Sequence, residues 1–464
     1  MNNRIVILGG GESGIGAAIL ALKKGYDVFV SDAGAISGDK RRILKSSDID
    51  YEEEGHTESK ILNAEIVIKS PGIPDSAPLV KKLVDQGTPV ISEIEFAYRF
   101  IEKAKVIAIT GTNGKTTTSL LTYHLLRNAG YNVALGGNIG KSLAGLVAEG
   151  EYHYYVVEVS SFQLDGIVNF KPDVAVLLNI TPDHLDRYEY NFNNYVSSKF
   201  RIAENLTRDE AFVYCADTSL IEEEASKRKV DACMFAMSTS TNKNLSAYLE
   251  DEHLIFNYQY KGRDENHKIP VSEISLIGKH NMVNSMAAVL SSLCMDVSIE
   301  NILSGLKTFK NSPHRLELVD EIDGVAYIND SKATNVDAVF YALDGVKKDI
   351  VWIAGGVDKG NQYDQIKQLV EEKVKAIICL GTDNSALLNY FEGIVDTMVE
   401  VDSAEDAIEK AKELAISGNA VLLSPACASF DLFKNYEDRG DKFKEAIHQL
   451  KKKSTSLINQ NPIS

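Results

Sequence analysis

The 464-residue sequence contains no apolar run that approaches the roughly 18–20 residues needed to span a bilayer as a helix. Its start, MNNRIVILGGG, passes from an apolar run into a glycine loop without a signal-peptide cleavage site. Its 5 cysteines are widely scattered and form no CxxC pair, so neither a disulfide framework nor a thiolate zinc site is indicated. We therefore expect a cytoplasmic protein with reduced thiols and no stable membrane insertion.

Basic residues are also in deficit, since 49 Lys and Arg stand against 66 Asp and Glu, a net charge of −17. Such a surface repels a phosphate backbone or an anionic membrane except at a local basic patch, which argues against nucleic-acid binding. Apolar residues make up 44% of the chain, and 10 prolines accompany 32 glycines, a composition typical of globular proteins. Any phosphate chemistry must therefore take place at focused sites.

The length exceeds what one hydrophobic core supports, which is roughly 250–300 residues. A strand, a glycine loop and a helix follow one another from residue 4, and the same pattern restarts at residue 105. After a proline-containing connection at 309–315, strands and helices alternate again. We predict an α/β protein of three domains, 1–95, 96–312 and 313–464, with mainly parallel sheets. Residues 205–275 are mixed in character, and no chemistry can be placed there.

The first glycine loop, Gly9–Gly14, fits GxGxxG, and Asp32 ends the following strand. Backbone N–H groups at the start of a helix approach a diphosphate closely when the loop is rich in glycine. Taken alone, this motif favours a nicotinamide-cofactor domain and thus an NAD(P)-dependent oxidoreductase. The structural alternative is a tight strand-to-helix turn that uses glycine for steric reasons only.

The second glycine loop, TGTNGKTT at 110–117, is the most specific signal in the chain. Gly111 and Gly114 permit the loop to wrap a phosphate, Lys115 supplies a positive charge, and the Thr116 hydroxyl can bind Mg²⁺. Because Ile109 replaces the first glycine of GxxxxGK[ST], this is a shorter variant. The order strand, loop, helix predicts a P-loop that binds a nucleoside triphosphate, and a nucleotide-dependent switch is one alternative.

Oxygen ligands for Mg²⁺ are available at the ends of the next two predicted strands, where Glu158, Asp183 and His184 lie. Lys199 follows, but an ammonium group has no lone pair with which to bind a metal. From the residue type alone, Lys199 is a surface or salt-bridge lysine.

The last third of the chain carries polar loops near predicted strand ends. Arg315 is suited to clamp a phosphate, and Lys332 and Ser429 to bind a small anion such as a carboxylate. Asp330 is suited to hold a ribose or to position Lys332. For each of these residues, simple turn chemistry is an equally good explanation.

Seven motifs together resemble the ATP-dependent Mur ligases of bacterial peptidoglycan synthesis: TGTNGKTT, EVSSFQLD, NITPDHLDRY with the later Lys199, GKHNMVN, PHRLE, NDSKATN and SPACASFDLFKNYEDRGDKF. They occur in the family's order and cover nearly the whole chain. The last two motifs, the N-terminal glycine loop and GGNIG at 136–140 are most similar to members that add D-glutamate to UDP-N-acetylmuramoyl-L-alanine. The remaining alternatives are a sibling Mur ligase adding another amino acid and a folate polyglutamate synthetase, although the N-terminal glycine loop counts against the latter.

The resemblance implies a monomer with an N-terminal Rossmann-like domain for the UDP moiety, a central P-loop ATPase domain and a C-terminal Rossmann-like domain for ADP and the amino acid. Its small-molecule substrates would be the UDP-sugar, D-glutamate and ATP, with two Mg²⁺ ions. The implied UDP-substrate contacts are Ser13, Asp32, Gly72, Asn138, Ser160 and His184. Near Asp32 this chain has Ala33 and Gly34, without the polar side chains that some members use at the uracil.

The remaining implied positions belong to ATP, the metals and D-glutamate. The ATP contacts are Gly111, Thr112, Asn113, Gly114, Lys115, Thr116, Thr117, Asn281, Asn284, Arg315 and Asp330. The metal ligands are Thr116, Glu158, His184 and Lys199, the last as a carbamate that turns a cation into an oxygen ligand. D-Glutamate would meet Lys332, Thr334, Ser429, Phe430 and Tyr436. Lys115, His184 and Lys199 are the implied catalytic residues.

Overall fold

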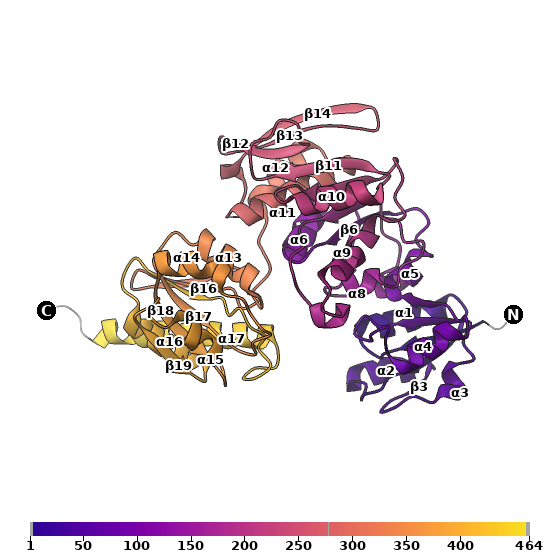
Figure 1. Cartoon of the computed structure of the whole chain (residues 1–464), viewed down its shortest axis with the longest axis horizontal. Helices are drawn as coiled ribbons and strands as arrows, with labels where there is room; N and C mark the ends of the chain where they lie inside the picture. Colours follow the sequence, from indigo (N-terminus) through magenta and orange to yellow (C-terminus); the bar gives the residue numbers. More distant parts are fainter. Residues whose placement is uncertain (1–2, 277, 461–464) are drawn as a thin grey trace. The chain divides into compact units, whose positions relative to one another are not determined.

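The computed structural model describes residues 3–276 and 278–460, and it contains three β-sheets flanked by helices (Figure 1). The predicted α/β class with mostly parallel strands is confirmed. The chain divides into two compact units, of which the first holds the residues up to Leu276 and the segment Asn281–Phe309, and the second holds the rest. Within the described residues, no helix is both long and apolar enough to cross a membrane.

The N-terminal sheet is five-stranded and entirely parallel, in the order β3-β2-β1-β4-β5. Parallel strands are buried on both faces, which explains apolar runs such as RIVIL in β1. Because all strands point the same way, the loops after them gather at one edge. The strands are β1 (Arg4–Leu8), β2 (Asp27–Ser31), β3 (Asp50–Glu52), β4 (Ile66–Lys69) and β5 (Val90–Ser92); the helices are α1 (Glu12–Lys23), α2 (Gly38–Ser46), α3 (Glu58–Ile61), α4 (Pro78–Asp85) and α5 (Glu93–Tyr98).

The central sheet has nine strands in the order β14-β13-β12-β11-β10-β9-β6-β8-β7. It is parallel from β7 to β12, and the antiparallel pairs β12–β13 and β13–β14 complete it with residues from 205–275. The strands are β6 (Lys105–Thr110), β7 (Val133–Gly137), β8 (Tyr154–Glu158), β9 (Val174–Leu177), β10 (Ala211–Cys215), β11 (Cys233–Ser238), β12 (Ala247–Glu250), β13 (His253–Tyr260) and β14 (Arg263–Pro270). The helices are α6 (Lys115–Asn128), α7 (Leu143–Glu149), α8 (Ser161–Leu164), α9 (Phe192–Phe200), α10 (Ser219–Arg228), α11 (Lys279–Cys294) and α12 (Ile299–Thr308), with 3₁₀ turns at Leu185–Tyr188, Arg201–Ala203 and Val271–Glu273.

Helices α1 and α7 join these two sheets within the first unit. A Cβ at Gly16 would overlap the Ser142 hydroxyl, so the two helices approach as closely as glycine permits. Glu93 of α5 accepts a hydrogen bond from the Ala144 backbone N–H, and the Lys23 ammonium donates to the Ala148 carbonyl at 2.6 Å. One hydrophobic cluster includes residues of both sheets, so the N-terminal and central segments share a core.

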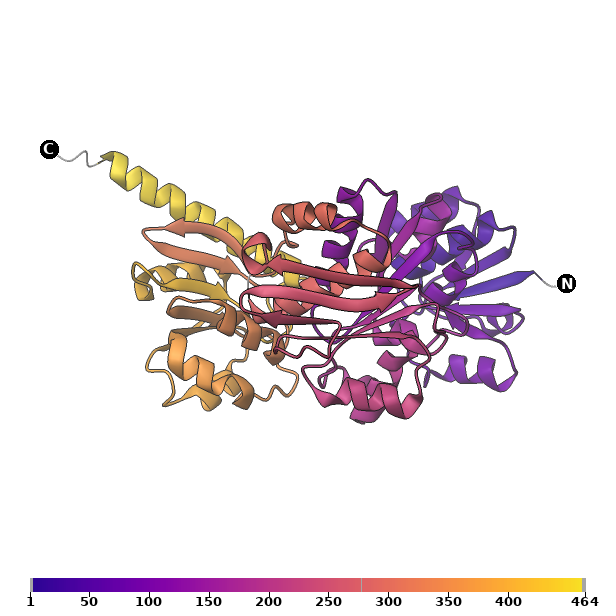
Figure 2. The ribbon, with the colours of Figure 1, turned by 90° about the horizontal axis from the view of Figure 1, so that it is seen from above.

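The second unit contains a six-stranded sheet in the order β15-β16-β20-β17-β18-β19, parallel except for the β15–β16 hairpin. Both faces of this sheet are covered by separate hydrophobic clusters. Helix α17 packs on the unit with its first turns and extends beyond it (Figure 2). The strands are β15 (Glu317–Ile322), β16 (Val325–Asn329), β17 (Ile350–Ala354), β18 (Val374–Leu380), β19 (Met398–Val401) and β20 (Ala420–Leu423); the helices are α13 (Val336–Gly345), α14 (Asp364–Lys373), α15 (Ser385–Phe391), α16 (Ala404–Leu414) and α17 (Tyr436–Gln460).

Candidate active site

The P-loop connects β6 to α6, and Asn179, which follows β9, hydrogen-bonds to it. The Asn113 backbone N–H donates to the Asn179 side-chain oxygen at 2.8 Å, and the Thr112 N–H donates to the Asn179 carbonyl at 2.9 Å. Gly114 caps α6 with φ = +85°, a backbone conformation that favours glycine. The sequence assigned no role to Asn179, although its place directly after a buried strand at the same sheet edge is a usable signal.

Lys115 folds back over the loop, where its ammonium group donates to the carbonyls of Gly111 and Thr112, both at 2.8 Å. Thr116 and Thr117 are buried in the first turn of α6. The N-terminus of a helix attracts anions, because its backbone N–H groups carry partial positive charge. The predicted phosphate-binding residues therefore lie together on one loop and one helix start.

Asn281 and Asn284 lie on α11 and are both buried. The Thr118 hydroxyl of α6 donates to the Asn284 side-chain oxygen at 3.2 Å, and the Asn284 amide donates to the Asn281 oxygen at 3.0 Å. A Cβ at Gly114 would overlap that same Asn284 oxygen. The structure thus brings these two asparagines, more than 160 positions away in sequence, directly to the P-loop helix.

Glu158 ends β8 and is almost completely buried. One carboxylate oxygen accepts the Asn138 amide at 2.9 Å, whereas the other has no hydrogen-bond partner among the described residues. A buried, unsatisfied carboxylate oxygen is costly unless a cation or a donor meets it. Ser160, by contrast, forms a reciprocal capping box with Gln163 at the start of α8, so its present hydrogen bonds are structural.

Lys199 is only 2% exposed, and its side-chain nitrogen donates to the same Gly111 carbonyl that Lys115 contacts, at 2.8 Å. The nitrogen also lies 4.7 Å from the centre of the Tyr195 ring. Burial, reinforced by the charge of Lys115, lowers the pKa of Lys199 well below its usual range. The surface-lysine alternative is therefore wrong, because Lys199 faces the P-loop from within the protein.

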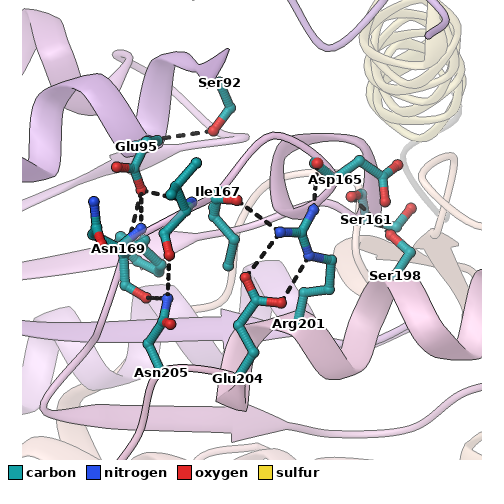
Figure 3. A network of polar contacts seen from close by, with 12 residues as sticks. Ser92, Glu95, Ser161, Asp165, Ile167, Asn169, Ser198, Arg201, Glu204 and Asn205 are labelled. Carbon is teal, nitrogen blue, oxygen red and sulfur yellow. Dashed lines mark hydrogen bonds and ion pairs between the residues drawn. The ribbon is translucent and has the colours of Figure 1, made fainter. Parts of the chain in front are cut away.

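A polar network fixes α9, which carries Lys199, against the loop after α8 (Figure 3). The Arg201 guanidinium donates to the carbonyls of Asp165 and Ile167 and pairs with Glu204. The Ser198 hydroxyl donates to the Ser161 carbonyl at 2.9 Å. These bonds hold α9 on both sides of Lys199, because its neighbour Ser198 and the nearby Arg201 are both anchored.

The same loop is anchored from α5 by Glu95, whose side chain is fully buried (Figure 3). One Glu95 oxygen accepts the backbone N–H groups of Val168, Asn169 and Phe170, each at 2.9 Å, and the other accepts Arg99 at 3.2 Å. Hydrogen bonds to a charged group are stronger than neutral ones. The segment between the first two sheets therefore helps to position the loop that supports Lys199.

His184 lies in a left-handed turn with φ = +51°, and its side chain is 47% exposed. Its ring packs edge-on against Phe162 at 5.2 Å. Nearby Arg187 lies over the Phe162 ring, 4.5 Å from its centre, and donates to the carbonyls of Pro71 and Gly72 at 3.3 and 3.2 Å. Arg187 thus ties the His184 turn to the N-terminal sheet, a role that the sequence did not indicate.

The predicted UDP contacts Ser13, Asp32 and Gly72 line one open pocket of about 580 Å³ at the edge of the N-terminal sheet. Both Asp32 oxygens are occupied, by the N–H groups of Gly10 at 2.6 Å and Gly34 at 2.8 Å. A Cβ at position 14 would overlap the Gly9 carbonyl, so this position requires glycine. The pocket has the helix N-terminus that suits a diphosphate.

In the second unit, Asp330 directly follows β16 and is buried with Arg315 near it. Burial raises the pKa of Asp330 to about 6, against the opposing effects of Arg315 and of the Ser424 hydroxyl, which donates at 3.0 Å. The Arg315 Nε is itself buried without a hydrogen-bond partner in the described part of the chain. A buried guanidinium nitrogen without a partner suits a site that receives a polar ligand.

The predicted D-glutamate residues gather in loops of the same unit. The Lys332 ammonium lies 5.5 Å from the Tyr436 ring centre, Ser429 is buried, and Phe430 is 73% exposed. Thr334 lies two residues beyond Lys332, between β16 and α13. Most of these predicted residues lie in the loops that follow β16 and β20, and these two strands are neighbours in the sheet.

Arg439 is a further buried side chain that sequence reasoning missed. It donates to the Ser331 hydroxyl at 3.0 Å and to the carbonyls of Ser331 and Cys427 at 2.9 and 3.3 Å. Burial lowers its pKa to about 10. Arg439 thus joins the loop of Lys332 to the loop of Ser429, and its position inside the charged run YEDRGDKF gives no signal of burial.

Three family models match consecutive parts of the chain: a MurD N-terminal domain over residues 4–78, a Mur ligase middle domain over 109–292 and a Mur ligase, glutamate ligase domain over 314–427. The chain is 52% identical to a protein of Christiangramia forsetii named UDP-N-acetylmuramoylalanine--D-glutamate ligase, over 97% of this chain and 100% of that one. This chain belongs to the Mur ligase family. A protein of the same name from Cytophaga hutchinsonii is 50% identical, with 97% and 100% coverage.

Solved structures share the fold of this Mur ligase at low identity. A pseudomurein peptide ligase type C from Methanothermus fervidus has a TM-score of 0.60 at 21% identity, covering 97% of this chain and 100% of its own. A UDP-N-acetylmuramate-alanine ligase from Thermotoga maritima has a TM-score of 0.59 at 18% identity, covering 96% and 99%. The three-domain fold expected from the resemblance is thereby confirmed.

Proposed function

We propose that this Mur ligase joins D-glutamate to UDP-N-acetylmuramoyl-L-alanine with ATP, through an acyl phosphate, in peptidoglycan precursor synthesis. The observation that carries the proposal is the 52% identity over the full length of a relative of that name. The site agrees with it, since an ATP loop, a pocket suited to a diphosphate and a cationic loop set occur in one chain. We assign the UDP-substrate, ATP and amino-acid roles to residues 1–95, 96–312 and 313–464.

The first chemical step would be attack of the substrate carboxylate on the γ-phosphorus of ATP, which releases ADP. Lys115 and the N–H groups of the P-loop would balance the charge on the transferring phosphoryl group, so the protein contributes mainly positioning and electrostatics. Asn281 and Asn284 hold the other side of the loop, where they would contact the nucleotide. Arg315 and Asp330 are the nucleotide contacts that we assign to the second unit.

Two Mg²⁺ ions would be held by Thr116, Glu158, His184 and a carbamate on Lys199. The fit is supported by the Glu158 oxygen that lacks a partner among the described residues. No three His, Cys, Asp or Glu side chains gather into a metal site in the described part of the chain, so ATP and carbamate oxygens must supply further ligands. The metal supplies positive charge to the phosphoryl oxygens.

The Lys199 carbamate requires an uncharged amine, because only a free lone pair can add to CO₂. Burial and the neighbouring Lys115 both favour the neutral form of Lys199. The carbamate would carry a negative charge into the same space, where Lys115 and the metal ions would balance it. The buried position of Lys199 thus disfavours a permanent ammonium group and favours the carbamate.

In the second step, the amine of D-glutamate would attack the acyl carbon and displace phosphate. Lys332, Thr334, Ser429, Phe430 and Tyr436 would hold D-glutamate, with Lys332 as the counter-charge for a carboxylate. The amine must lose a proton, and the base that we assign to this step is His184, which is half exposed on its turn. This role competes with metal ligation, because a neutral imidazole has a single nitrogen lone pair. We further propose that the protein works as a cytoplasmic monomer.

The decisive experiment measures ADP formation with UDP-N-acetylmuramoyl-L-alanine and a panel of D-glutamate, L-alanine, L-lysine and meso-diaminopimelate. We expect turnover with D-glutamate only. Phosphate release with another amino acid, together with none for D-glutamate, would contradict the proposed specificity and favour a sibling activity. A Lys332→Met variant is the matched test, since it keeps side-chain length while removing the charge, and it should raise the KM for D-glutamate more than the KM for ATP.

A further inference from the structure

His56 forms one wall of the nucleotide pocket, at the point where β3 leads into α3. It lines both the 580 Å³ pocket and a smaller apolar pocket of about 280 Å³, which also includes Leu8, Leu79 and Val80. The polar pocket at the glycine loop and the apolar pocket therefore meet at His56. The apolar pocket is suited to a flat ring. None of the roles assigned above uses this histidine.

A chain of hydrogen bonds fixes the imidazole. His56 Nδ1 lies 2.7 Å from the Ser31 hydroxyl oxygen, and this hydroxyl lies 2.7 Å from a Glu52 oxygen. A carboxylate only accepts hydrogen bonds, and a hydroxyl has a single proton. The Ser31 proton therefore points to Glu52, and Nδ1 of His56 must donate to Ser31.

Glu52 keeps the ionised form that this assignment requires. Burial opposes ionisation, but the Thr57 backbone N–H, at 2.8 Å, and the Ser31 hydroxyl outweigh it and hold the pKa of Glu52 below its usual value. Ser31 is completely buried, so water cannot substitute in the chain. In the neutral imidazole the proton then sits on Nδ1, and Nε2 is a hydrogen-bond acceptor.

Glu12, Ser13 and Ser70 also line the 580 Å³ pocket, but among the residues that line both this pocket and the apolar one, His56 has the polar side chain. Within residues 3–276, Nε2 of His56 makes no hydrogen bond. Both oxygens of Asp32 are occupied by backbone N–H groups, and the next residues, Ala33 and Gly34, bring no polar side chain. Nε2 of His56 is thus available to accept a hydrogen bond from a ligand at the junction of the two pockets.

Uracil and cytosine differ at the atom that such an acceptor recognises. Uracil carries a hydrogen on N3, whereas N3 of cytosine is itself an acceptor, so a bare Nε2 attracts the first and repels the second. We propose that His56, held by Ser31 and Glu52, accepts the N3–H of the uracil ring and selects uridine over cytidine nucleotides. The inference rests on the proposed UDP-linked substrate and makes His56 a specificity-determining residue, away from the reacting atoms.

The test measures binding of UDP, CDP and N3-methyl-UDP to the full-length protein by calorimetry. His56 is exposed in the free protein, but a bound base takes the place of water at Nε2. An acceptor left unpaired in that complex costs enough that the wild type should bind UDP roughly tenfold more tightly than either analogue. His56→Phe keeps an aromatic ring without the acceptor, so it should bind UDP about tenfold more weakly and all three nucleotides within about twofold of one another. The control is His448→Phe on α17, an exposed histidine whose loss should change nothing.

Ser31→Ala tests the hydrogen-bond chain rather than the histidine itself. Nitrogen-15 spectra of labelled histidine should show His56 with its proton on Nδ1 in the wild type and a mixture of tautomers in Ser31→Ala. ATP affinity, measured alongside, should match the wild type, and a cooperative unfolding transition should establish that each variant is folded. If His56→Phe keeps the uracil preference, or the wild type has none, the inference is wrong.

These outcomes are separable from the proposed function. A wild type that prefers UDP to CDP but ligates no D-glutamate would contradict the proposed function and leave the base recognition supported. Turnover with D-glutamate but no preference among the three nucleotides would support the proposed function and contradict the role of His56.

Discussion

Two glycines at opposite ends of α6 allow the P-loop geometry to be tested with a matched pair. Gly114 precedes the helix with φ = +85°, and Gly130 follows it with φ = +86°. A Cβ at Gly130 meets nothing within 4 Å, whereas one at Gly114 would overlap the Asn284 side-chain oxygen. Gly130→Ala therefore introduces backbone strain alone, and Gly114→Ala introduces the same strain and a clash.

The magnitudes follow from these contacts. A left-handed backbone costs an alanine about 1 kcal/mol, which both variants share. Moving Asn284 would also break its hydrogen bonds with Thr118 and Asn281, at about 1 kcal/mol each. We expect Gly130→Ala to lower the free energy of unfolding by about 1 kcal/mol and Gly114→Ala by about 3 kcal/mol.

The assay combines urea unfolding with ATP binding by calorimetry. Because Asn281 and Asn284 are proposed nucleotide contacts, Gly114→Ala should weaken ATP binding at least roughly tenfold, while Gly130→Ala should leave it unchanged. Equal destabilisation by the two variants, with equal ATP affinities, would refute the contact between the loop and α11 as the reason for glycine at this position.

Three buried ionisable groups of the first unit, Lys199, Glu93 and Glu95, provide further tests. Lys199→Ala should abolish ADP formation and regain part of it with added short carboxylates, and full activity without them would exclude the carbamate. Burial raises the pKa of Glu93 to about 8, so the folded state keeps a proton that the unfolded state has lost, and wild-type stability should fall as the pH rises from about 4.5 to 8. Glu93→Gln should lack this loss, worth up to about 5 kcal/mol at 1.36 kcal/mol per pKa unit, and parallel pH curves for the two proteins would contradict it. Glu95→Gln should weaken its three backbone hydrogen bonds, destabilise the protein by about 2 kcal/mol and lower kcat without changing the KM for ATP, whereas exposed Glu102→Gln should be neutral in both measurements.

Local signals were sufficient to predict much of the fold. The second strand, loop and helix start at residue 105 and follow in the predicted order, with β6 over Lys105–Thr110 and α6 from Lys115. An apolar run, two glycines and a lysine specify these elements within a few residues. The region 205–275 could not be assigned in this way. Its strands β13 and β14 complete an antiparallel edge of the central sheet, and their exposed alternate residues weaken the apolar signal.

The candidate site divides in the same way. Its motif residues were visible in the sequence because P-loop chemistry needs fixed residue types at fixed spacing. The supporting residues Arg187 and Arg439 were not visible, because each acts on a backbone group far away in sequence. Backbone carbonyls and N–H groups are present at every position, so a bond to one leaves no pattern in the sequence.

The sequence by itself determined the α/β class, the two glycine loops, the family resemblance and the residue types that handle phosphate. The tertiary structure decided which side chains are buried, which of them carry a charge and which groups they contact. By residue type, Lys199 is expected at the surface, but α9 places it against the P-loop, where burial and Lys115 lower its pKa. His56 has no motif, but folding sets it against Ser31 and Glu52, and this contact fixes its proton. The physical reason is that desolvation and hydrogen-bond direction depend on neighbours in space, which spacing along the chain does not specify.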